Sequence, residues 1–586
     1  MRRAIPRALG LGALVAGLVV PATARAVPDA ATYANLAAAF DNVGIATGRD
    51  PQAADIDGQG HSLSAEDLAA AGWTPGTHVT VAGTTLAWPS AAAGRRDNVV
   101  ADGQTITVHG KGTAVALLVA ATNGDASGSG AITYSDGSHA VYDVSAPDWV
   151  SGANDTKTLT LPHWNTPTGT DFVNTKLYTV LAPIDPKRTV RSITLPTTTG
   201  GALHVFALAL RPATSGWAGT WSAAIDDGLV NGPWTDRTLR MVEHTSVGGT
   251  QTRIRLDNAF GRAPVTIGHA TIAVEASGSA ATATPRTLTF NGHRSVTIPA
   301  GGQAVSDAVG FAVPADTNLL VSLYLPGPVQ LAADHSLGMQ DMYSSADYSG
   351  DHTADVGTFP NKYTFGFWTL LSGIDVTAPA GSVVTLGDSI TDGVGSTYNG
   401  NDRWPNDLAR RLLGRTPAYG VADEGISANR IVTDLFTGDP GTGGGGIRAL
   451  ARLDRDVFSQ TGVRSVVVLE GINDLKAGTP PEQVIDGLRQ IAQQAHGYGL
   501  RVVVATITAF KGWSEYTPQY EANRQQVNAF IRNNGGVFDA TVDFDAVTRD
   551  PADPQQLLAA YDSGDHLHPG PAGYHAMADA IDLSTL

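Results

Sequence analysis

The sequence predicts a multidomain protein in which two N-terminal all-β sandwich or jelly-roll domains precede a C-terminal three-layer α/β domain with a parallel sheet. The chain has 586 residues, about twice the size at which a single hydrophobic core stops growing. Before residue 379, short apolar runs alternate with polar residues, a pattern typical of strands. After it, continuous apolar runs alternate with segments of helical periodicity, which indicates a parallel sheet covered by helices.

Turn-forming dipeptides punctuate the β region. Asp136-Gly137 and Asn291-Gly292 each separate two alternating apolar segments, and Gly248-Gly249 precedes another such segment. Asn, Asp and Gly tolerate the positive φ angles that two-residue hairpin loops require. We therefore expect a hairpin at each of these dipeptides, and repeated short strands of this kind favour sandwiches or jelly rolls.

A polar link from Arg211 to Ser215 divides the β region into two, because it follows the apolar run Leu203–Leu210. A second boundary is expected at Pro379, where the pattern changes. The predicted domains are residues 27–212, 213–378 and 379–586.

The α/β region has recognisable strands and one clear helix. Three continuous apolar runs predict strands that are buried on both faces: Val383–Leu386, Val466–Leu469 and Val502–Ile507. Thr479 and Glu482 have the spacing of a capping box and are followed by apolar residues at helical spacing. This predicts a helix that ends at Gly497.

The N-terminus has the pattern of a signal peptide. Arg2, Arg3 and Arg7 precede an apolar run, Ala8 to Val20, that is too short to span a bilayer, and a small-residue site follows at Ala24-Arg25-Ala26. We expect cleavage after Ala26 and a secreted, extracellular protein without a stable membrane anchor. A short anchor is the alternative, and the choice between the Sec and twin-arginine routes stays open.

Composition narrows the classes of chemistry. The formal net charge of -17 disfavours binding to nucleic acid and to anionic membranes. The absence of cysteine excludes disulfides, thiolate metal sites and cysteine nucleophiles.

Three polar clusters follow predicted strands or precede the last helical segment. They are Gly387-Asp388-Ser389, Gly471-Ile472-Asn473-Asp474, and the stretch from Asp565 to His568. Singly, they have ordinary interpretations as a turn, a helix cap and surface histidines. Ligands bind at the carboxyl ends of parallel strands, however, so their joint occurrence in this order favours a functional site.

These residue types fit nucleophilic catalysis. A serine hydroxyl needs a base to take its proton, and histidine suits that role near neutral pH when a carboxylate holds its other nitrogen. Ser389, His568 and Asp565 supply this set, and the side-chain amide of Asn473 suits an oxyanion hole together with the Ser389 N–H and a glycine N–H. His566 is a rival base, although it is adjacent to Asp565 in the chain.

On these residues the stretch 381–586 resembles the SGNH (GDSL) hydrolases, in the secreted bacterial esterase subgroup. The resemblance implies a flavodoxin-like domain, a Ser389-His568-Asp565 triad, and no cofactor or metal. It also implies an oxyanion hole formed by Ser389, Gly425 and Asn473. The matching blocks are Gly387-Asp388-Ser389, Glu424 to Arg430, Gly471 to Asp474, and Asp565 to His568.

The β region carries two further resemblances. Residues 217–376 resemble the sandwich that precedes the catalytic domain in this subgroup, and residues 30–211 resemble an accessory β domain of secreted bacterial glycosidases. The tryptophans of the first domain have two alternative uses, stacking on sugar rings and packing in a core. They are Trp73, Trp88, Trp149 and Trp164.

We therefore expect a secreted serine esterase that acts through an acyl-enzyme and removes acyl groups, such as acetyl, from a polysaccharide. A lipase or general carboxylesterase with the same triad is one alternative. A non-catalytic carbohydrate-binding protein is the alternative of another class. Acyl chain length, the sugar or lipid of the substrate and the oligomeric state are not determined at this level.

Overall fold

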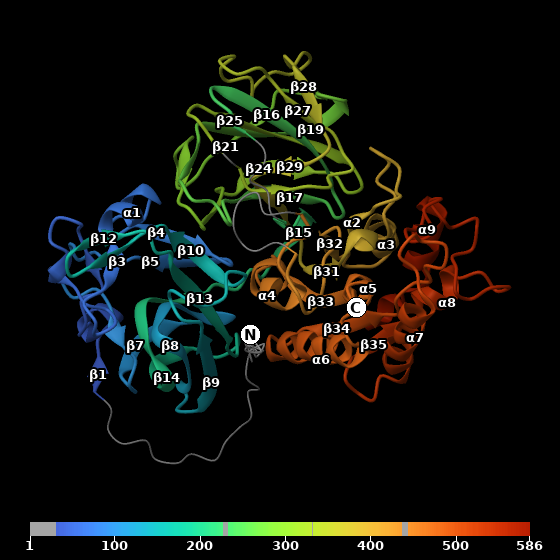
Figure 1. Ribbon diagram of the computed structural model, residues 1–586. Coiled ribbons are helices and arrows are strands. Elements are labelled where there is room, and N and C mark those ends of the chain that lie inside the picture. Colours follow the sequence, from blue (N-terminus) through green and yellow to red (C-terminus); the bar gives the residue numbers. More distant parts are fainter. Residues whose placement is uncertain (1–30, 227–231, 331, 436–443) are drawn as a thin grey trace, which may run out of the picture.

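The computed structural model describes residues 31–226, 232–330, 332–435 and 444–586. The signal peptide predicted for residues 1–26 lies outside these residues. Two β parts and one α/β part meet around a common junction (Figure 1). The fold is thus the predicted multidomain one, whereas the boundaries at residues 212 and 378 stay a prediction.

The first part is a β-sandwich of an eight-stranded and a four-stranded sheet. The larger sheet runs β1 (Thr32–Tyr33), β7 (Thr105–Gly110), β14 (Val190–Arg211), β8 (Ala114–Tyr134), β13 (Thr175–Pro183) and β10 (Lys157–Leu161), with β6 (Val99–Val100) beside β14 and β9 (His139–Ala146) beside β8. The smaller runs β12 (Gly169–Asp171), β11 (Trp164–Thr166), β3 (Ser62–Ser64) and β2 (Ile45–Ala46). Its helices are α1 (Ala65–Ala70) and the 3₁₀ turns Leu36–Ala39 and Pro51–Ala53.

The second part, which we call the middle sandwich, has two seven-stranded sheets. One runs β15 (Trp217–Ser222), β30 (Leu371–Thr377), β17 (Gly249–Asp257), β23 (Gln303–Val305), β4 (His78–Val81) and β5 (Thr84–Ala87), with β24 (Val309–Val313) beside β17. The other runs β20 (Ala280–Ala281), β19 (His269–Ser277), β25 (Asn318–Leu325), β16 (Arg237–His244), β27 (Met342–Ser344) and β28 (Tyr363–Phe365), with β21 (Arg286–Leu288) beside β19. Two short pairs complete it: β18 (Val265–Ile267) with β22 (Val296–Ile298), and β26 (Asp334–His335) with β29 (Trp368–Thr369).

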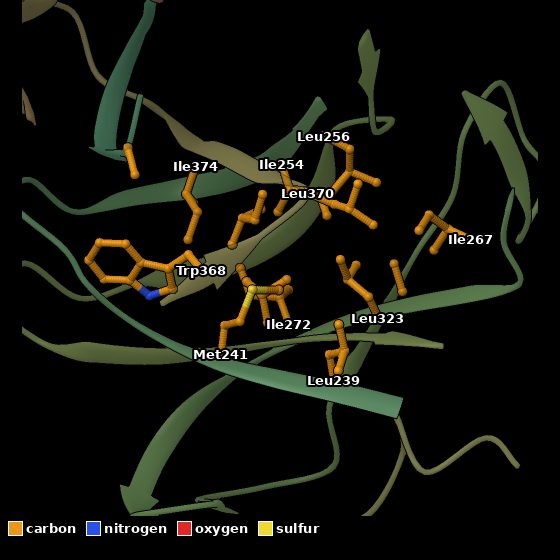
Figure 2. Close-up of a cluster of buried hydrophobic side chains, with 14 of the residues drawn as sticks. Leu239, Met241, Ile254, Leu256, Ile267, Ile272, Leu323, Trp368, Leu370 and Ile374 are labelled. Carbon is orange, nitrogen blue, oxygen red and sulfur yellow. The ribbon is translucent and has the colours of Figure 1, made fainter. Parts of the chain in front are cut away.

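Every second side chain along these strands points inward, and these side chains form the core of the middle sandwich. Leu239 and Met241 of one sheet face Ile254, Leu256 and Ile374 of the other, and all are buried. Figure 2 shows these side chains between the two layers, with Trp368 at one side of the cluster.

The third part is an α/β domain with five parallel strands in the order β32 (Gly420–Gly425), β31 (Ser382–Gly387), β33 (Val463–Leu469), β34 (Arg501–Ala505) and β35 (Ala540–Val542). This 2-1-3-4-5 order is the flavodoxin-like one. The helices are α2 (Ser389–Asp392), α3 (Trp404–Leu412), α4 (Ala449–Leu453), the π-helical Asp454–Phe458, α5 (Ile472–Lys476), α6 (Pro481–Gly497), α7 (Pro518–Asn533), α8 (Phe544–Thr548), α9 (Pro571–Ala580) and the 3₁₀ turn Leu583–Thr585.

Helices cover both faces of this sheet. Even-numbered valines of the central strands, such as Val466, pack with α4, α6 and α7. Their odd-numbered neighbours, such as Val467, pack with α3, α8 and α9. Because both side-chain directions are buried, the strands read as continuous apolar runs, as predicted.

The predicted turns differ in what they join. Asp136-Gly137 connects β8 and β9 as a paired hairpin, as expected. Asn291-Gly292 does form a tight turn, closed by the Phe290–His293 bridge, but the flanking β21 and β22 pair with other strands. Gly248 directly precedes β17, which begins at Gly249 and lies in a different sheet from β16. The hairpin prediction was therefore wrong at Gly248-Gly249, whereas at Asn291-Gly292 the turn was confirmed and only the pairing of the flanking strands differs. Dipeptides reverse the chain locally, whereas packing selects the pairing partner.

The structure also tests the predicted capping box of α6 and the two uses considered for the tryptophans. Helix α6 has Pro480 as its N-cap and no side-chain cap bond, so the expected capping box does not form, although the helix does end at Gly497. Trp73, Trp88 and Trp149 are buried in the first sandwich, where Trp73 and Trp88 pack edge to face. These three indoles therefore pack in the core.

The parts are joined by strands and hydrogen bonds. The hairpin β4–β5 of the first part adds to a sheet of the middle sandwich through Thr80 and Gln303. The hydroxyl of Ser382, at the start of β31, accepts a hydrogen bond of 2.8 Å from the N–H of Gly219 in β15. The middle sandwich thus contacts the α/β sheet directly.

Candidate active site

The predicted site residues gather at the carboxyl ends of the central strands. In register, Gly387 of β31 pairs with Gly425 of β32 and with Leu469 of β33, so the three strands end at one level. Ser389 opens α2 directly after β31, and Asn473 lies in α5 directly after β33. Parallel strands thus bring together segments that are far apart in sequence.

A hydrogen-bonded chain links serine, histidine and aspartate. Ser389 Oγ lies 2.8 Å from His568 Nε2, and His568 Nδ1 lies 2.6 Å from Asp565 Oδ2. Asp565 Oδ1 accepts the N–H groups of Leu567 and His568, each at 2.9 Å. Because a carboxylate can only accept, Nδ1 carries the hydrogen and Nε2 is free to accept the serine proton.

Burial and hydrogen bonding set the charge states of this pair. Burial lowers the pKa of His568 below its ordinary value, although the Asp565 carboxylate acts in the opposite direction. Burial would raise the pKa of Asp565, but the N–H and ring of His568 and the N–H of Leu567 outweigh it and lower that pKa. Near neutral pH the site therefore holds a neutral histidine beside an ionised aspartate, the combination that general-base catalysis needs.

The turn around Ser389 is held by its neighbours. The buried carboxylate of Asp388 caps α2 by accepting the N–H of Ile390 at 2.9 Å. Burial raises the pKa of Asp388 to about 7, against the hydrogen bond from Ile390. The buried Asp388 side chain bonds the backbone of its own turn, in agreement with a role in shaping that turn.

Asn473 lies at the same edge of the sheet. Its Nδ2 donates to the carbonyl oxygen of Asn429 at 3.1 Å, and its Oδ1 lies 3.5 Å from Lys476 Nζ. The amide group has two hydrogens, so one remains for a ligand.

Gly425 is placed differently from the expectation. Its N–H donates to Asp423 Oδ1 at 3.1 Å and is therefore already engaged. A Cβ at Gly425 would lie 2.2 Å from the backbone nitrogen of Asp392, so glycine permits the close packing of β32 against α2.

Sequence reasoning missed Ala428 in the same loop. Ala428 is exposed and has a φ of 66°, a conformation that alanine rarely adopts. Its neighbours are fixed: the Ser427 N–H donates to Asp392 Oδ2 at 2.8 Å, and Asn429 accepts from Asn473. Within the described ranges the Ala428 N–H has no hydrogen-bond partner. No composition or spacing signal marks this residue, because its role comes from the shape of the loop.

His566, the rival base, pairs with a different carboxylate. His566 Nδ1 lies 2.6 Å from Asp562 Oδ2, and its side chain is 52% exposed. Asp562 Oδ1 also accepts the His566 N–H at 3.0 Å. The loop thus contains a second histidine–aspartate pair of similar form beside the one that contacts Ser389.

The rim of the site has an aromatic residue that the sequence patterns did not single out. The ring of Trp513 lies edge to face with His568, with centroids 6.0 Å apart. Lys476 Nζ lies 4.9 Å from the Trp513 ring centroid and 3.5 Å from Glu515. These residues place an apolar surface and a cation beside the base.

In the described ranges, no group of three or more His, Asp or Glu side chains is placed to hold a metal ion. None of the helices with described residues is long and apolar enough to cross a membrane.

Comparison with known proteins agrees with this architecture. Residues 385–576 match the GDSL-like Lipase/Acylhydrolase family, and residues 32–213 match the AziU2-like beta-sandwich domain. No curated protein matches the chain.

Solved structures that match this chain cover about a third of it. A putative arylesterase from Agrobacterium tumefaciens is 19% identical over 34% of this chain and 95% of its own, with a TM-score of 0.27. A putative lipolytic protein of the G-D-S-L family from Desulfitobacterium hafniense is 19% identical over 34% and 96%, with a TM-score of 0.26. An acetyl xylan esterase from Geobacillus stearothermophilus is 20% identical over 34% and 91%, with a TM-score of 0.27.

Proposed function

We propose that this chain, which carries a GDSL-like acylhydrolase domain behind an N-terminal β-sandwich domain, is a serine esterase with Ser389 as its nucleophile. One observation carries the proposal: Ser389, His568 and Asp565 form an unbroken hydrogen-bonded chain at the carboxyl end of the sheet. An inactive carbohydrate-binding protein has no need of this arrangement.

The geometry supports a two-step reaction. His568 Nε2 takes the proton of Ser389 Oγ as the oxygen attacks the ester carbonyl carbon, while Asp565 stabilises the imidazolium. Collapse of the tetrahedral intermediate breaks the bond to the alkoxide, which receives the proton from His568, and an acyl-enzyme remains. Water then attacks the acyl group by the same proton route and releases the acid and free Ser389.

Three donors suit the oxyanion of the intermediate. Ser389 is the first residue of α2, so its N–H has no partner within the helix. The second hydrogen of Asn473 Nδ2 and the N–H of Ala428 are the other two. Ala428 takes the place that we first expected for Gly425, whose N–H is bonded to Asp423. Removal of one such donor costs about 3 kcal/mol of transition-state stabilisation in other serine hydrolases.

The substrate proposal is acyl groups, such as acetyl, on an extracellular polysaccharide, with the protein secreted after cleavage at Ala26. The signal-peptide pattern and the resemblance of the N-terminal part to accessory domains of secreted glycosidases support it. The apolar edge of Trp513 beside His568 offers a surface for a small acyl group or a sugar ring.

The test is hydrolysis of p-nitrophenyl acetate, butyrate and a long-chain ester by the chain from residue 27 on. Ser389→Ala should lower kcat by several orders of magnitude, about 10⁶ in a serine protease precedent. Ser584→Ala, an exposed serine in the C-terminal turn, is the matched control and should leave kcat unchanged.

Each outcome has a definite meaning. Faster turnover of acetate than of the long-chain ester would support a deacetylase, and the reverse order would support a lipase. Hydrolysis that persists in Ser389→Ala would refute Ser389 as the nucleophile, and no hydrolysis by the unsubstituted protein would refute the esterase.

A further inference from the structure

The middle sandwich places one histidine against the nucleophile turn of the α/β domain. His335 ends β26, and its Nε2 lies 3.1 Å from Oδ1 of Asp392, the last residue of α2. The side chains are 3% and 0% exposed, so this contact between two domains is closed to solvent. The catalytic chemistry described above does not use it.

The hydrogen bonds around His335 require a charged ring. Nδ1 lies 2.8 Å from the carbonyl oxygen of Ala224. Nε2 lies 3.1 Å from the carbonyl oxygen of Leu337 and faces Asp392 as well. Carbonyl and carboxylate oxygens only accept, so both ring nitrogens must carry a hydrogen, and the ring is an imidazolium. A neutral ring would leave one buried nitrogen facing an acceptor.

Besides Asp392, the carboxylates of Asp226 and Asp423 lie near this ring, together with the cation of Arg403. Asp226 Oδ2 accepts the N–H of Ser336, next to His335, at 2.9 Å. Arg403 donates to the carbonyl oxygen of Gly338 and lies 3.7 Å from Asp423. Burial lowers the pKa of His335, but the Asp392 carboxylate outweighs it and raises that pKa to about 10.

The indole of Trp368 completes the pocket. Its ring stacks on His335 with centroids 5.4 Å apart. The Arg403 guanidinium also contacts this indole, with its central carbon 5.4 Å from the ring centroid. Trp368 belongs to the core cluster of the middle sandwich (Figure 2), so the pocket is anchored in that core.

Asp392, which bonds His335 through Oδ1, also bonds the loop beside the nucleophile. Its second oxygen, Oδ2, accepts the N–H of Ser427 at 2.8 Å and the hydroxyl of Ser427 at 2.9 Å. Ser427 directly precedes Ala428, the proposed backbone donor. One carboxylate therefore joins the middle sandwich, the end of the nucleophile turn and the oxyanion loop.

We propose that His335 is a positioning residue of the esterase: its imidazolium orients Asp392, which holds both the Ser389 turn and the Ser427–Ala428 loop. The inference rests on the proposed function. It follows that the α/β domain alone has an incomplete active site and that the middle sandwich supplies the missing charge.

The test compares two histidines of the same sandwich in the full chain. His335→Gln keeps a side-chain donor for Asp392 but removes the charge. His269→Gln is the matched control, because the His269 ring pairs with Asp351 at 2.8 Å, a residue of the same sandwich. We expect kcat on p-nitrophenyl acetate to fall about 10- to 100-fold in His335→Gln with KM nearly unchanged, since misplacement by about 1 Å costs about 10²-fold. His269→Gln should keep the kcat of the unsubstituted protein.

Two further variants separate positioning from a loss of folding. Ser427→Ala removes one bond to Asp392 and leaves the ion pair, so kcat should fall several-fold at an unchanged thermal midpoint. Asp392→Asn combined with His335→Gln should be no slower than the slower single variant, because both act on one contact. Additive losses, or equal kcat in His335→Gln and His269→Gln, would overturn the positioning role while leaving the esterase intact.

A spectroscopic measurement tests the charge without any substrate. In ¹⁵N-histidine-labelled protein at pH 8, His335 should show two exchange-protected ring hydrogens that are absent from His335→Gln. A ring with one hydrogen would overturn the proposal whether or not the protein hydrolyses esters. Failure of the unsubstituted protein to hydrolyse any ester would overturn the proposed function, and the positioning role with it.

Discussion

Replacing Asp565 by Asn tests how the base is held. The carboxylate of Asp565 accepts two backbone N–H groups through Oδ1 and the His568 ring through Oδ2. In Asp565→Asn the oxygen stays with the two N–H donors, so the new NH₂ group faces His568 Nδ1. Two donors cannot bond to each other, and the ring must take the tautomer with hydrogen on Nε2. That nitrogen then donates to Ser389 and no longer accepts its proton.

The expected loss is large. The same substitution in a serine protease lowers kcat about 10⁴-fold through the wrong tautomer, which corresponds to about 5.4 kcal/mol at 1.36 kcal/mol for each tenfold step. The assay is kcat on p-nitrophenyl acetate, with the thermal midpoint measured in parallel. Asp562→Asn is the control, because the Asp562 carboxylate bonds His566 in a similar way, whereas Asp565 bonds His568.

The result that would refute this reasoning is a loss of less than tenfold in Asp565→Asn, or an equal loss in Asp562→Asn. The first would mean that Asp565 does not set the tautomer. The second would mean that the whole loop, rather than this one carboxylate, determines the rate.

Two other predictions concern pH and the oxyanion. Activity needs neutral His568, whose pKa burial lowers below 6.5. We therefore expect kcat/KM to rise with pH through a midpoint below 6.5 and to stay high above it; a midpoint above 7 in the pH profile would contradict the direction of the shift. Asn473→Ala should lower kcat about 10²- to 10³-fold with little change in KM, since the amide bonds a charge that develops only in the transition state. Steady-state kinetics beside Asn523→Ala checks this, because Asn523 is a half-buried residue of α7 whose side chain accepts a hydrogen bond from Gln519. A rise in KM alone would argue against the oxyanion role.

Much of the α/β domain could be predicted from sequence because its signals are local. Burial on both faces leaves an unbroken apolar run such as Val466–Leu469, and this run needs no knowledge of its partners. Ser389, Asn473 and the Asp565–His568 stretch could be singled out because each follows a strand or precedes a helix. Strand order then brings their ends to one level, as the register of Gly387 with Gly425 and Leu469 shows.

Local signals were insufficient wherever a partner far along the chain decides the outcome. Asn291-Gly292 specifies a tight turn, yet β21 and β22 pair elsewhere because a sandwich core can be completed by several strands. Gly425 is present as expected, but its N–H donates to Asp423, whereas the Ala428 N–H has no hydrogen-bond partner among the residues that the structure describes.

By itself, then, the sequence determined the class of each domain and the residue types of the candidate triad, because periodicity and strand-end motifs are properties of neighbouring residues. The sequence also favoured His568 over His566 as the base, and the tertiary structure places His568 within hydrogen-bond distance of Ser389. Only the tertiary structure decided that His335 meets Asp392 across a domain boundary. The physical reason is that a buried hydrogen bond depends on distance and direction between groups 57 or 179 positions apart, which no local pattern encodes.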